Sequence, residues 1–323
     1  MRRREFIALI GGATAAWPLA ARAQQPLPVI GYLGSTAPST DRPRVAAFVK
    51  RLGELGWIND RNVDLELRWA NGDAANARAI AAEFVRLNVS VIMAVGTADV
   101  LAVKQATAAI PIVFVSGDPL SAGVVESLAR PGGNATGLSL EQTGTASKRL
   151  ALLREIVPNL HRLAVMGNVG VPSVKAEAAE VLDAAHTLDL EITQLGLHRS
   201  EDIDPAIKAI EGHVEALYVC ADPLVTTNET HINDLALSAH LPTMHGLPEN
   251  AAAGGLLAYG VDIPDLCRRA AEIVDKVLRG AKPADIPVEQ PNTFNFVINL
   301  RTAAALGLTI PYSTQLLADE VIE

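Results

Sequence analysis

The feature that most constrains this fold is a repeated alternation of short apolar runs with amphipathic helical patterns. In the first half, strands are predicted at residues 29–34, 63–69, 90–95 and 112–115. The segments between them show helical spacing of apolar residues, with caps at residues 39–41 and a stop at Gly56. This βαβαβαβ order predicts a parallel sheet wrapped by helices.

The same order of elements then repeats in the second half. Helices are predicted near residues 146–156, 173–188 and 202–211, with a long helix to about residue 240. Strands are predicted at 162–166, 190–195, 216–220 and 242–245. Two similar halves indicate an α/β fold of two doubly wound lobes rather than one large sheet. A small ligand would lie between them, outside the carboxyl ends of the strands.

Composition narrows the class of protein. The chain is 49% hydrophobic but only 4% aromatic, so small and branched aliphatic residues build its core, which suits helices on parallel sheets. The formal net charge is −9, which disfavours nucleic acid and anionic membrane surfaces as partners. Cys220 and Cys267 can form one bridge at most, and the sequence leaves open whether they meet.

The N-terminus predicts export. Arg2-Arg3-Arg4-Glu5-Phe6-Ile7 resembles the twin-arginine export motif, and a mildly apolar stretch follows to Ala20. Ala21-Arg22-Ala23 is a small-x-small cleavage site, so residues 1–23 are expected to be a cleaved signal peptide. The alternative is a membrane anchor or an accidental basic start. The expected compartment is the periplasm.

A search for motifs that carry chemistry finds none. The sequence has no phosphate-binding loop, no His-Glu-x-x-His and no Gly-x-Ser-x-Gly. Gly132–Gly137 is Gly-rich but does not join a strand to a helix, and His240 and His245 lack a third metal ligand nearby. We therefore expect no cofactor, no metal, no catalytic residue and no enzymatic activity.

Polar residues gather instead at the carboxyl ends of the predicted strands. Thr97 opens a helix, whose N-terminus is a suitable seat for a carboxylate. Asp222 and Asp262 are candidates to hold an ammonium group. For a single Asp or Thr before a helix, capping alone is the commoner role. The case for a site rests on several such residues meeting at one edge.

Several stretches resemble one family of proteins. They include Leu52–Trp57 with Arg61–Val63, Ile110–Pro119, Leu128–Gly137, Lys148–Pro158, Ala251–Leu256, Gly280–Pro291 and Phe296–Ala303. In this order they are similar to the ABC-transporter substrate-binding proteins that include tryptophan-type and other aromatic amino-acid binders, with a type I periplasmic binding protein fold. The resemblance covers residues 28–308.

The resemblance implies that the chain crosses between lobes three times, near 138–143, 260–264 and 290–294. The expected divisions are residues 27–140 plus 263–290 for lobe 1, and 141–262 plus 291–318 for lobe 2. Carried over by position, eight residues are expected to contact the ligand: Ser35, Thr97, Ser116, Asp118, Asn168, Asp222, His245 and Asp262.

Two departures from the family pattern bear on the ligand. Where the amino-acid binders commonly have two tyrosines after Gly-x-Asp, this chain has Ile263-Pro264, which puts an aromatic amino acid in doubt. Where many have an acidic pair after the last strand of the second lobe, this chain has Leu247-Pro248-Glu249.

The expected function is therefore a periplasmic solute-binding component of an ABC importer. It would be a monomer that closes two lobes on a small carboxylate-bearing solute, an amino acid or a related organic acid, and delivers it to a permease and ATPase. The alternatives are a ligand-sensing protein that docks on a receptor and, with less support, a periplasmic α/β enzyme.

Overall fold

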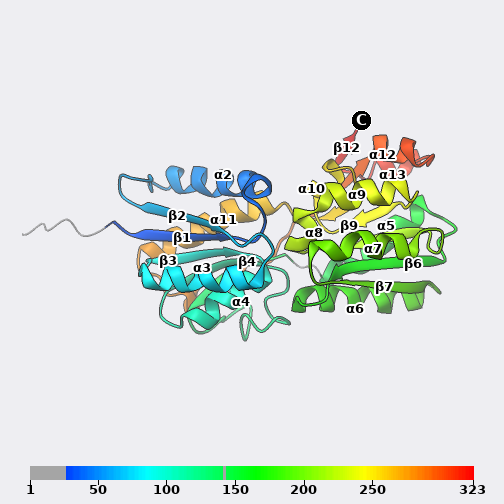
Figure 1. The fold of residues 1–323 in the computed structure, drawn as a ribbon. Coiled ribbons are helices and arrows are strands. Elements are labelled where there is room, and N and C mark those ends of the chain that lie inside the picture. The colour runs from blue at the N-terminus through cyan, green and yellow to red at the C-terminus, as the bar shows by residue number, and fades with distance from the viewer. Residues whose placement is uncertain (1–26, 141–142) are drawn as a thin grey trace, which may run out of the picture.

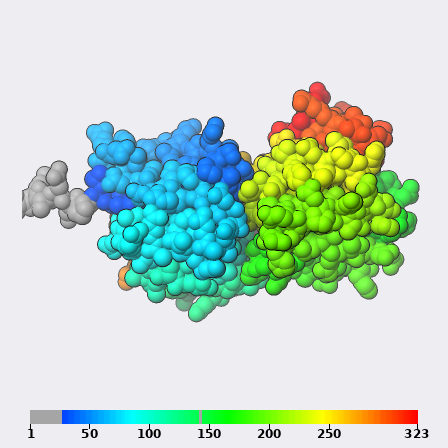
Figure 2. All heavy atoms as spheres, viewed as in Figure 1, coloured from blue at the N-terminus to red at the C-terminus, as the bar shows by residue number. Residues whose placement is uncertain are grey.

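The computed structural model describes residues 27–140 and 143–323, which form two α/β lobes side by side (Figure 1). The predicted signal peptide at residues 1–23 lies outside the described residues. Figure 2 shows the two lobes meeting along a furrow, where the blue and cyan surface of the first abuts the yellow and green surface of the second.

Lobe 1 is built on a five-stranded sheet in the order β2-β1-β3-β4-β5, and all four neighbouring pairs are parallel. Its strands are β1 (Val29–Gly34), β2 (Asp64–Trp69), β3 (Val91–Val95), β4 (Ile112–Ser116) and β5 (Ala135–Ser139). The helices are α2 (Pro38–Glu54), α3 (Ala74–Arg86), α4 (Thr97–Ala106) and, from much later in the chain, α11 (Ile263–Leu278).

The strands of lobe 1 are apolar on both faces because helices cover both faces. Ile30 and Met93 point to one side and pack with α2 and α11, while Leu33 and Ile92 point to the other and pack with α3 and α4. The continuous apolar runs in the sequence therefore reflect a sheet that is buried on both sides.

Lobe 2 is built on a seven-stranded sheet in the order β12-β11-β10-β9-β8-β6-β7. Its strands are β6 (Arg162–Asn168), β7 (Glu191–Leu197), β8 (Ala216–Val219), β9 (Thr243–His245), β10 (Leu257–Gly260), β11 (Asn295–Asn299) and β12 (Glu320–Ile322). The pairs are parallel except β10 with β11, which is antiparallel.

Helices flank the second sheet as they do the first. They are α5 (Ala146–Ile156), α6 (Pro172–Thr187), α7 (Ile203–Ile210), α8 (Pro223–Thr227), α9 (Glu229–Ser238), α10 (Pro248–Ala252), α12 (Leu300–Ala305) and α13 (Tyr312–Gln315). Leu163 and Tyr218 pack with α5 and α6 on one face, and Ala164 and Leu217 pack with α7 and α9 on the other. Among the described helices, none is long and apolar enough to cross a bilayer.

The chain passes between the sheets three times: from β5 to α5, from β10 to α11, and from the turn Pro283–Asp285 to β11. Two of these segments support each other. Ser139 donates its backbone N–H to Glu289 at 2.9 Å, and Glu289 donates its own to Gly137 at 2.9 Å. This short pairing ties the first crossing to the third.

The structure corrects several details of the sequence prediction. Residues 135–139 form an edge strand, β5, which the sequence does not predict. The expected long helix to residue 240 is two helices, because the chain breaks at Asn228. Residues 320–322 pair with β11, so the second sheet extends beyond the expected end of lobe 2 at residue 318. The sequence leaves the state of Cys220 and Cys267 open, and in the structure both are buried and free.

Candidate ligand-binding site between the lobes

A cavity of about 40 Å³ lies between the lobes, with a wider groove of about 650 Å³ beside it. Both lobes line the cavity. From lobe 1 come Ser35, Thr36, Arg44, Val95, Gly96, Thr97, Gly117, Leu140 and Ile263, and from lobe 2 come Val171, Ser173, Ala221, Asp222, Pro223, Thr226 and Leu247. The cavity is small enough that an amino acid would require the lobes to move apart.

The lobe 1 wall forms where β1 and β3 end. Ser35 and Thr36 follow β1 directly, and both are at least 98% buried. Gly96 follows β3 and has a φ of 101°, and a Cβ at this position would lie 2.8 Å from the Cβ of Ser35. Only glycine fits this turn, which brings the start of α4 against the end of β1.

A cluster of hydroxyl groups joins the two lobes at the cavity. The Thr97 hydroxyl lies 3.1 Å from the Ser116 hydroxyl in lobe 1 and 3.1 Å from the Ser173 hydroxyl on α6 of lobe 2. It also accepts the backbone N–H of Gly117 at 3.1 Å. Because Ser116 stands behind Thr97, it supports the cavity wall rather than lining it.

Asp222 lines the cavity from lobe 2, but its carboxylate is already occupied. Oδ1 accepts the backbone N–H groups of Leu224 at 2.7 Å and Val225 at 3.1 Å, which caps α8. Oδ2 accepts the backbone N–H of Asn168 at 3.0 Å. Burial raises the pKa of this carboxyl to about 6, although the three N–H groups oppose the shift. Asn168 itself lines the wider groove.

Arg44 of α2 is the charged side chain that sequence reasoning missed. It is 3% exposed and lines the cavity. Its guanidinium forms an ion pair with Glu249 on α10 of lobe 2, and it lies 3.7 Å from Asp41 on its own helix. Its Nε is buried without a hydrogen-bond partner within the described part of the chain, as is the Thr36 hydroxyl.

Three of the expected ligand contacts lie away from the cavity. Asp118 accepts the N–H groups of Leu120 at 3.1 Å and Ser121 at 3.2 Å, so its carboxylate caps a turn. His245 is buried in the core of lobe 2, where its Nε2 lies 2.9 Å from Asn233 Oδ1. Burial lowers the pKa of His245 to about 3, so the ring is neutral.

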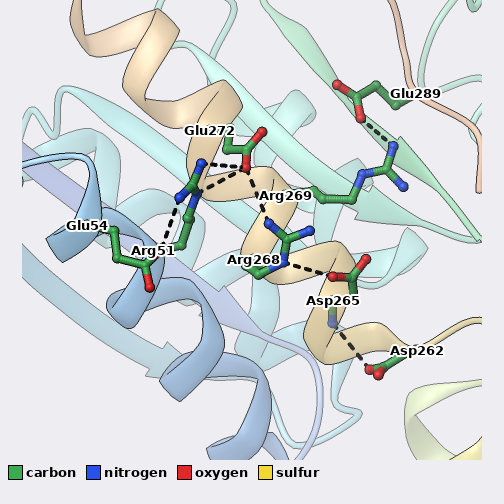
Figure 3. A network of polar contacts seen from close by, with 8 residues as sticks. All are labelled: Arg51, Glu54, Asp262, Asp265, Arg268, Arg269, Glu272 and Glu289. Carbon is green, nitrogen blue, oxygen red and sulfur yellow. Dashed lines mark hydrogen bonds and ion pairs between the residues drawn. The ribbon is translucent and has the colours of Figure 1, made fainter.

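Asp262 is exposed and begins α11 as its cap, accepting the N–H of Asp265 at 3.2 Å (Figure 3). It lines a separate crevice at the crossings, together with Arg269 and Asn292. Figure 3 also shows Arg269 reaching Glu289 of the third crossing. The expected role of Asp262 as a counter-charge in the cavity is therefore not supported by its position.

The sequence signal for the missed residues was present but weak. The sequence predicts helix caps at residues 39–41, whereas α2 begins at Pro38, so Asp41 and Arg44 form a buried pair three residues apart. Leu247 and Ile263 depart from the family pattern in the sequence, and both line the cavity. Among the described residues, no group of three or more His, Cys, Asp or Glu could hold a metal ion.

Two α/β lobes, three crossings and a cavity lined from both sides define the class of two-lobed solute-binding proteins. The chain belongs to the ABC transporter substrate binding protein family, because the sequence model of this family matches residues 37–322. As a member of this family it is an extracytoplasmic solute-binding protein, which binds a small ligand and works with permease and ATPase subunits.

Three similar proteins illustrate the family. A tyrosine-binding protein of Clostridioides difficile (strain R20291) is 28% identical over 272 residues, which are 84% of this chain and 78% of that protein. The crystal structure of an ABC domain from Streptococcus pneumonia in complex with L-Trp is 25% identical with a TM-score of 0.85, covering 92% of this chain and 100% of that one. A conserved domain protein of Vibrio cholerae is 26% identical with a TM-score of 0.86, covering 91% and 99%.

Proposed function

We propose that this chain binds a small amphiphilic solute bearing a carboxylate in the cavity between its lobes, and that Ser35, Thr36, Thr97, Arg44 and Asp222 form the polar part of the site. The observation that carries the proposal is the set of hydroxyl groups at the start of α4, which face apolar walls. A helix N-terminus with adjacent hydroxyl donors favours an anionic group.

The unpartnered atoms on the lobe 1 wall support this assignment. Thr36 Oγ1 and Arg44 Nε are buried polar groups on the cavity wall without a partner among the described residues. Leaving such groups unpaired costs about 1–3 kcal/mol each, which a ligand with acceptor oxygens would recover. The apolar side chains of Leu140, Leu247 and Ile263 complete the cavity.

The site differs from what an aromatic ligand would require. Leu247 and Ile263 stand on the cavity wall, and no aromatic side chain of the described chain lines the cavity. L-Trp is the ligand of the pneumococcal structure, and tyrosine is named for the clostridial relative. We propose that this chain takes a more compact, aliphatic solute than either.

The test compares Thr36→Val with Thr227→Val. Both hydroxyls are buried without a partner in the described chain, but only Thr36 lines the cavity. Calorimetry with the twenty standard L-amino acids and a set of short aliphatic carboxylates identifies a probe that binds the parent. Thr36→Val should bind that probe about threefold to tenfold more weakly, and Thr227→Val should match the parent. Equal affinities for all three proteins would contradict the proposed site.

We further propose that the lobes divide near residues 140, 262 and 290. We also propose export through the twin-arginine route, with cleavage after Ala23. The motivation is the paired arginines before Glu5-Phe6 and the Ala21-Arg22-Ala23 triplet. Replacing Arg3 and Arg4 by Lys should leave the protein in the cytoplasm, whereas Lys50→Arg should not affect export. N-terminal sequencing of the periplasmic protein should begin at Gln24, and unchanged export of the double variant would refute this route.

A further inference from the structure

Lobe 2 contains a second pocket that lies apart from the cavity between the lobes. It has a volume of about 150 Å³ and lies between α6 and the neighbouring strands β6 and β7, which run side by side in lobe 2 (Figure 1). It extends to Cys220 at the end of β8. None of its lining residues lines the cavity between the lobes, so the proposed function does not use it.

The pocket exists because two glycines are neighbours in the sheet. Gly167 of β6 pairs with Gly196 of β7, so two adjacent positions carry no side chain. On α6, Ala178 and Ala179 contribute only methyl groups to the lining. A Cβ at Gly167 would lie 2.6 Å from a methyl carbon of Val174. The first turn of α6 therefore packs on the sheet, and the small side chains beyond it leave a space.

This space is apolar at its base and opens at the protein surface. Cys220 is 0% exposed, and Val165 and Val174 are nearly as deeply buried. The polar lining residues Lys175 and Gln194 are both exposed, so they mark the opening. Among the residues that line the base, the Cys220 thiol is the most polar group, and a thiol behaves as a small hydrophobic group. An apolar cavity of about 150 Å³ is large enough for one benzene ring.

The pocket lies directly behind the lobe 2 wall of the cavity. Val174 follows Ser173, which lines the cavity and whose hydroxyl lies 3.1 Å from the Thr97 hydroxyl of lobe 1. Cys220 is likewise two residues before Asp222, which also lines the cavity. A molecule in the pocket would therefore contact the segments that position Ser173 and Asp222.

We propose that this pocket is a second binding site, which takes a small uncharged apolar molecule of about the size of one six-membered ring. A charged group would lose its hydration at the base of the pocket without gaining a partner there. The volume sets the size of the occupant, and the apolar base sets its chemistry. The site goes beyond the proposed function and does not depend on it.

Benzene is the probe for this site, and the two cysteines report where it binds. Cys220 lines the pocket, whereas Cys267 is equally buried in the core of lobe 1. Burial raises the pKa of both thiols, so both react slowly and the difference between their rates reports access. The folded protein is treated with methyl methanethiosulfonate at pH 8, with and without benzene. The thiolate attacks the sulfenyl sulfur, a methyl disulfide forms and methanesulfinate leaves, and peptide mass spectrometry follows each cysteine.

A variant that fills the pocket provides the second measurement. Ala178→Leu places a larger side chain in the pocket, and Ala206→Leu is its matched control. Both alanines are partly buried on helices of lobe 2, but Ala206 lies on α7 and does not line the pocket. Thermal unfolding at increasing benzene concentration measures binding to the parent and to both variants.

In the parent, Cys220 should react faster than Cys267. Benzene at about ten times its dissociation constant should slow the reaction of Cys220 about tenfold and leave that of Cys267 unchanged. Benzene should also raise the melting temperature of the parent and of Ala206→Leu, with saturation, but not that of Ala178→Leu.

The inference is wrong if benzene does not slow the labelling of Cys220, or if the two thiols react and are slowed equally, because the reagent then reaches Cys220 only through unfolding. It is also wrong if benzene stabilises Ala178→Leu as much as the parent. The labelling of the parent decides the question even if Ala178→Leu does not fold. Neither measurement needs the solute of the cavity, so failure here leaves the proposed function intact.

Discussion

The two lobes share an architecture but treat buried charge in different ways. In lobe 2, the guanidinium of Arg149 is 1% exposed and fully engaged. It pairs with Glu177 at 2.6 Å, donates to the Tyr218 hydroxyl at 3.1 Å, and donates to the backbone carbonyl of Tyr259 at 2.7 Å. Glu177 in turn accepts the backbone N–H of Ala221, a cavity residue, at 3.2 Å.

Lobe 1 leaves its buried polar groups incomplete on the side that faces the cavity. The Thr36 hydroxyl and Arg44 Nε are buried there without a hydrogen-bond partner in the described chain. Asp99, in the first turn of α4 and 4% exposed, likewise has no hydrogen bond or ion pair to its carboxylate within the described residues. Arg44 Nη2 reaches across to Glu249 of lobe 2, and Nη1 lies 3.7 Å from Asp41 of its own helix. In the proposed site, lobe 1 therefore supplies the polar groups that still lack partners, whereas the Asp222 carboxylate on the lobe 2 wall already accepts three backbone N–H groups.

The largest expected effect is a loss of stability when the buried hydrogen-bond network around Arg149 in lobe 2 is broken. Arg149→Met should lower the free energy of unfolding by about 3–5 kcal/mol, because it leaves Glu177 buried without its cation. Arg162→Met breaks an exposed ion pair with Glu215 in the same lobe and should cost less than about 1 kcal/mol. Urea unfolding followed by circular dichroism measures both. Similar losses for the two variants would show that lobe 2 does not depend on its buried network.

In lobe 1, removing a buried charge is expected to raise the free energy of unfolding instead of lowering it. Asp99→Asn should raise the free energy of unfolding by about 1–3 kcal/mol at pH 8, because it removes an unpaired buried carboxylate. The raised pKa of Asp99 means that the folded chain holds its proton more tightly than the unfolded chain. Stability of the parent should therefore fall as pH rises above the unfolded value of Asp, and the gain from Asp99→Asn should shrink towards pH 4.

The same unfolding measurement on Asp204→Asn controls for the loss of a first-turn acid. That variant should be neutral or slightly destabilising, because Asp204 is exposed and bonds His231. A loss of stability for Asp99→Asn at pH 8 would mean that Asp99 has a stabilising partner, and the contrast between the lobes would then disappear.

The fold could be predicted from the sequence because its main signal is local. Apolar runs such as residues 91–95 and 112–116 are buried on both faces, so burial does not depend on register. Edge strands lack this signal. β5 contains Thr136 and Gly137, and a Cβ at Gly137 would lie 2.0 Å from the carbonyl oxygen of Phe114. Its pairing with β4 is a tertiary fact that no local pattern encodes.

The site was only partly predictable for a related reason. Ser35, Thr97 and Asp222 follow strands directly, so the rule that strand ends converge brings them to the cavity. Asp118, His245 and Asp262 obey the same rule but turn away, because local N–H groups or core partners bind their side chains. Arg44 lies within a helix, and only the packing of α2 against α11 and the ion pair with Glu249 of lobe 2 place it in the wall.

Glu229, in the part of lobe 2 that faces Arg44, is expected to have a smaller effect on how stability depends on pH. Burial and the charge of Glu249 raise its pKa to about 7, while Arg44 and the Asn250 amide oppose the shift. The unfolded value is 4.5, so the folded chain holds this proton more tightly between pH 4.5 and about 7. Stability of the parent should fall as pH rises through that window and then level off.

Glu229→Gln should make this slope shallower, since Asp222 and Asp99 also hold protons more tightly in the folded chain, and should stabilise the protein by roughly 1–2 kcal/mol at pH 8, after allowance for the partial exposure of the side chain. Thermal unfolding from pH 4 to pH 8 measures both the slope and the gain in stability. Glu201→Gln, at an exposed acid of the same lobe, should leave the slope unchanged. A parent whose stability does not change between pH 5 and pH 8 would rule out a charge conflict at Glu229.

The smallest expected effect concerns the contact that joins the two lobes. The Arg44–Glu249 ion pair crosses the cleft from α2 to α10, and the side chain of Glu249 is 30% exposed. A pair of this exposure contributes about 1 kcal/mol, which corresponds to about a fivefold change in the ratio of closed to open molecules. Glu249→Gln should therefore increase the radius of gyration of the ligand-free protein in small-angle scattering, because two lobes joined by three short crossings move as rigid bodies.

Glu272→Gln removes an ion pair between α2 and α11 that lies within lobe 1, so it should leave the scattering curve unchanged. If neither variant alters the curve, the ion pair does not hold the lobes together, and Arg44 contributes to binding of the solute but not to lobe closure.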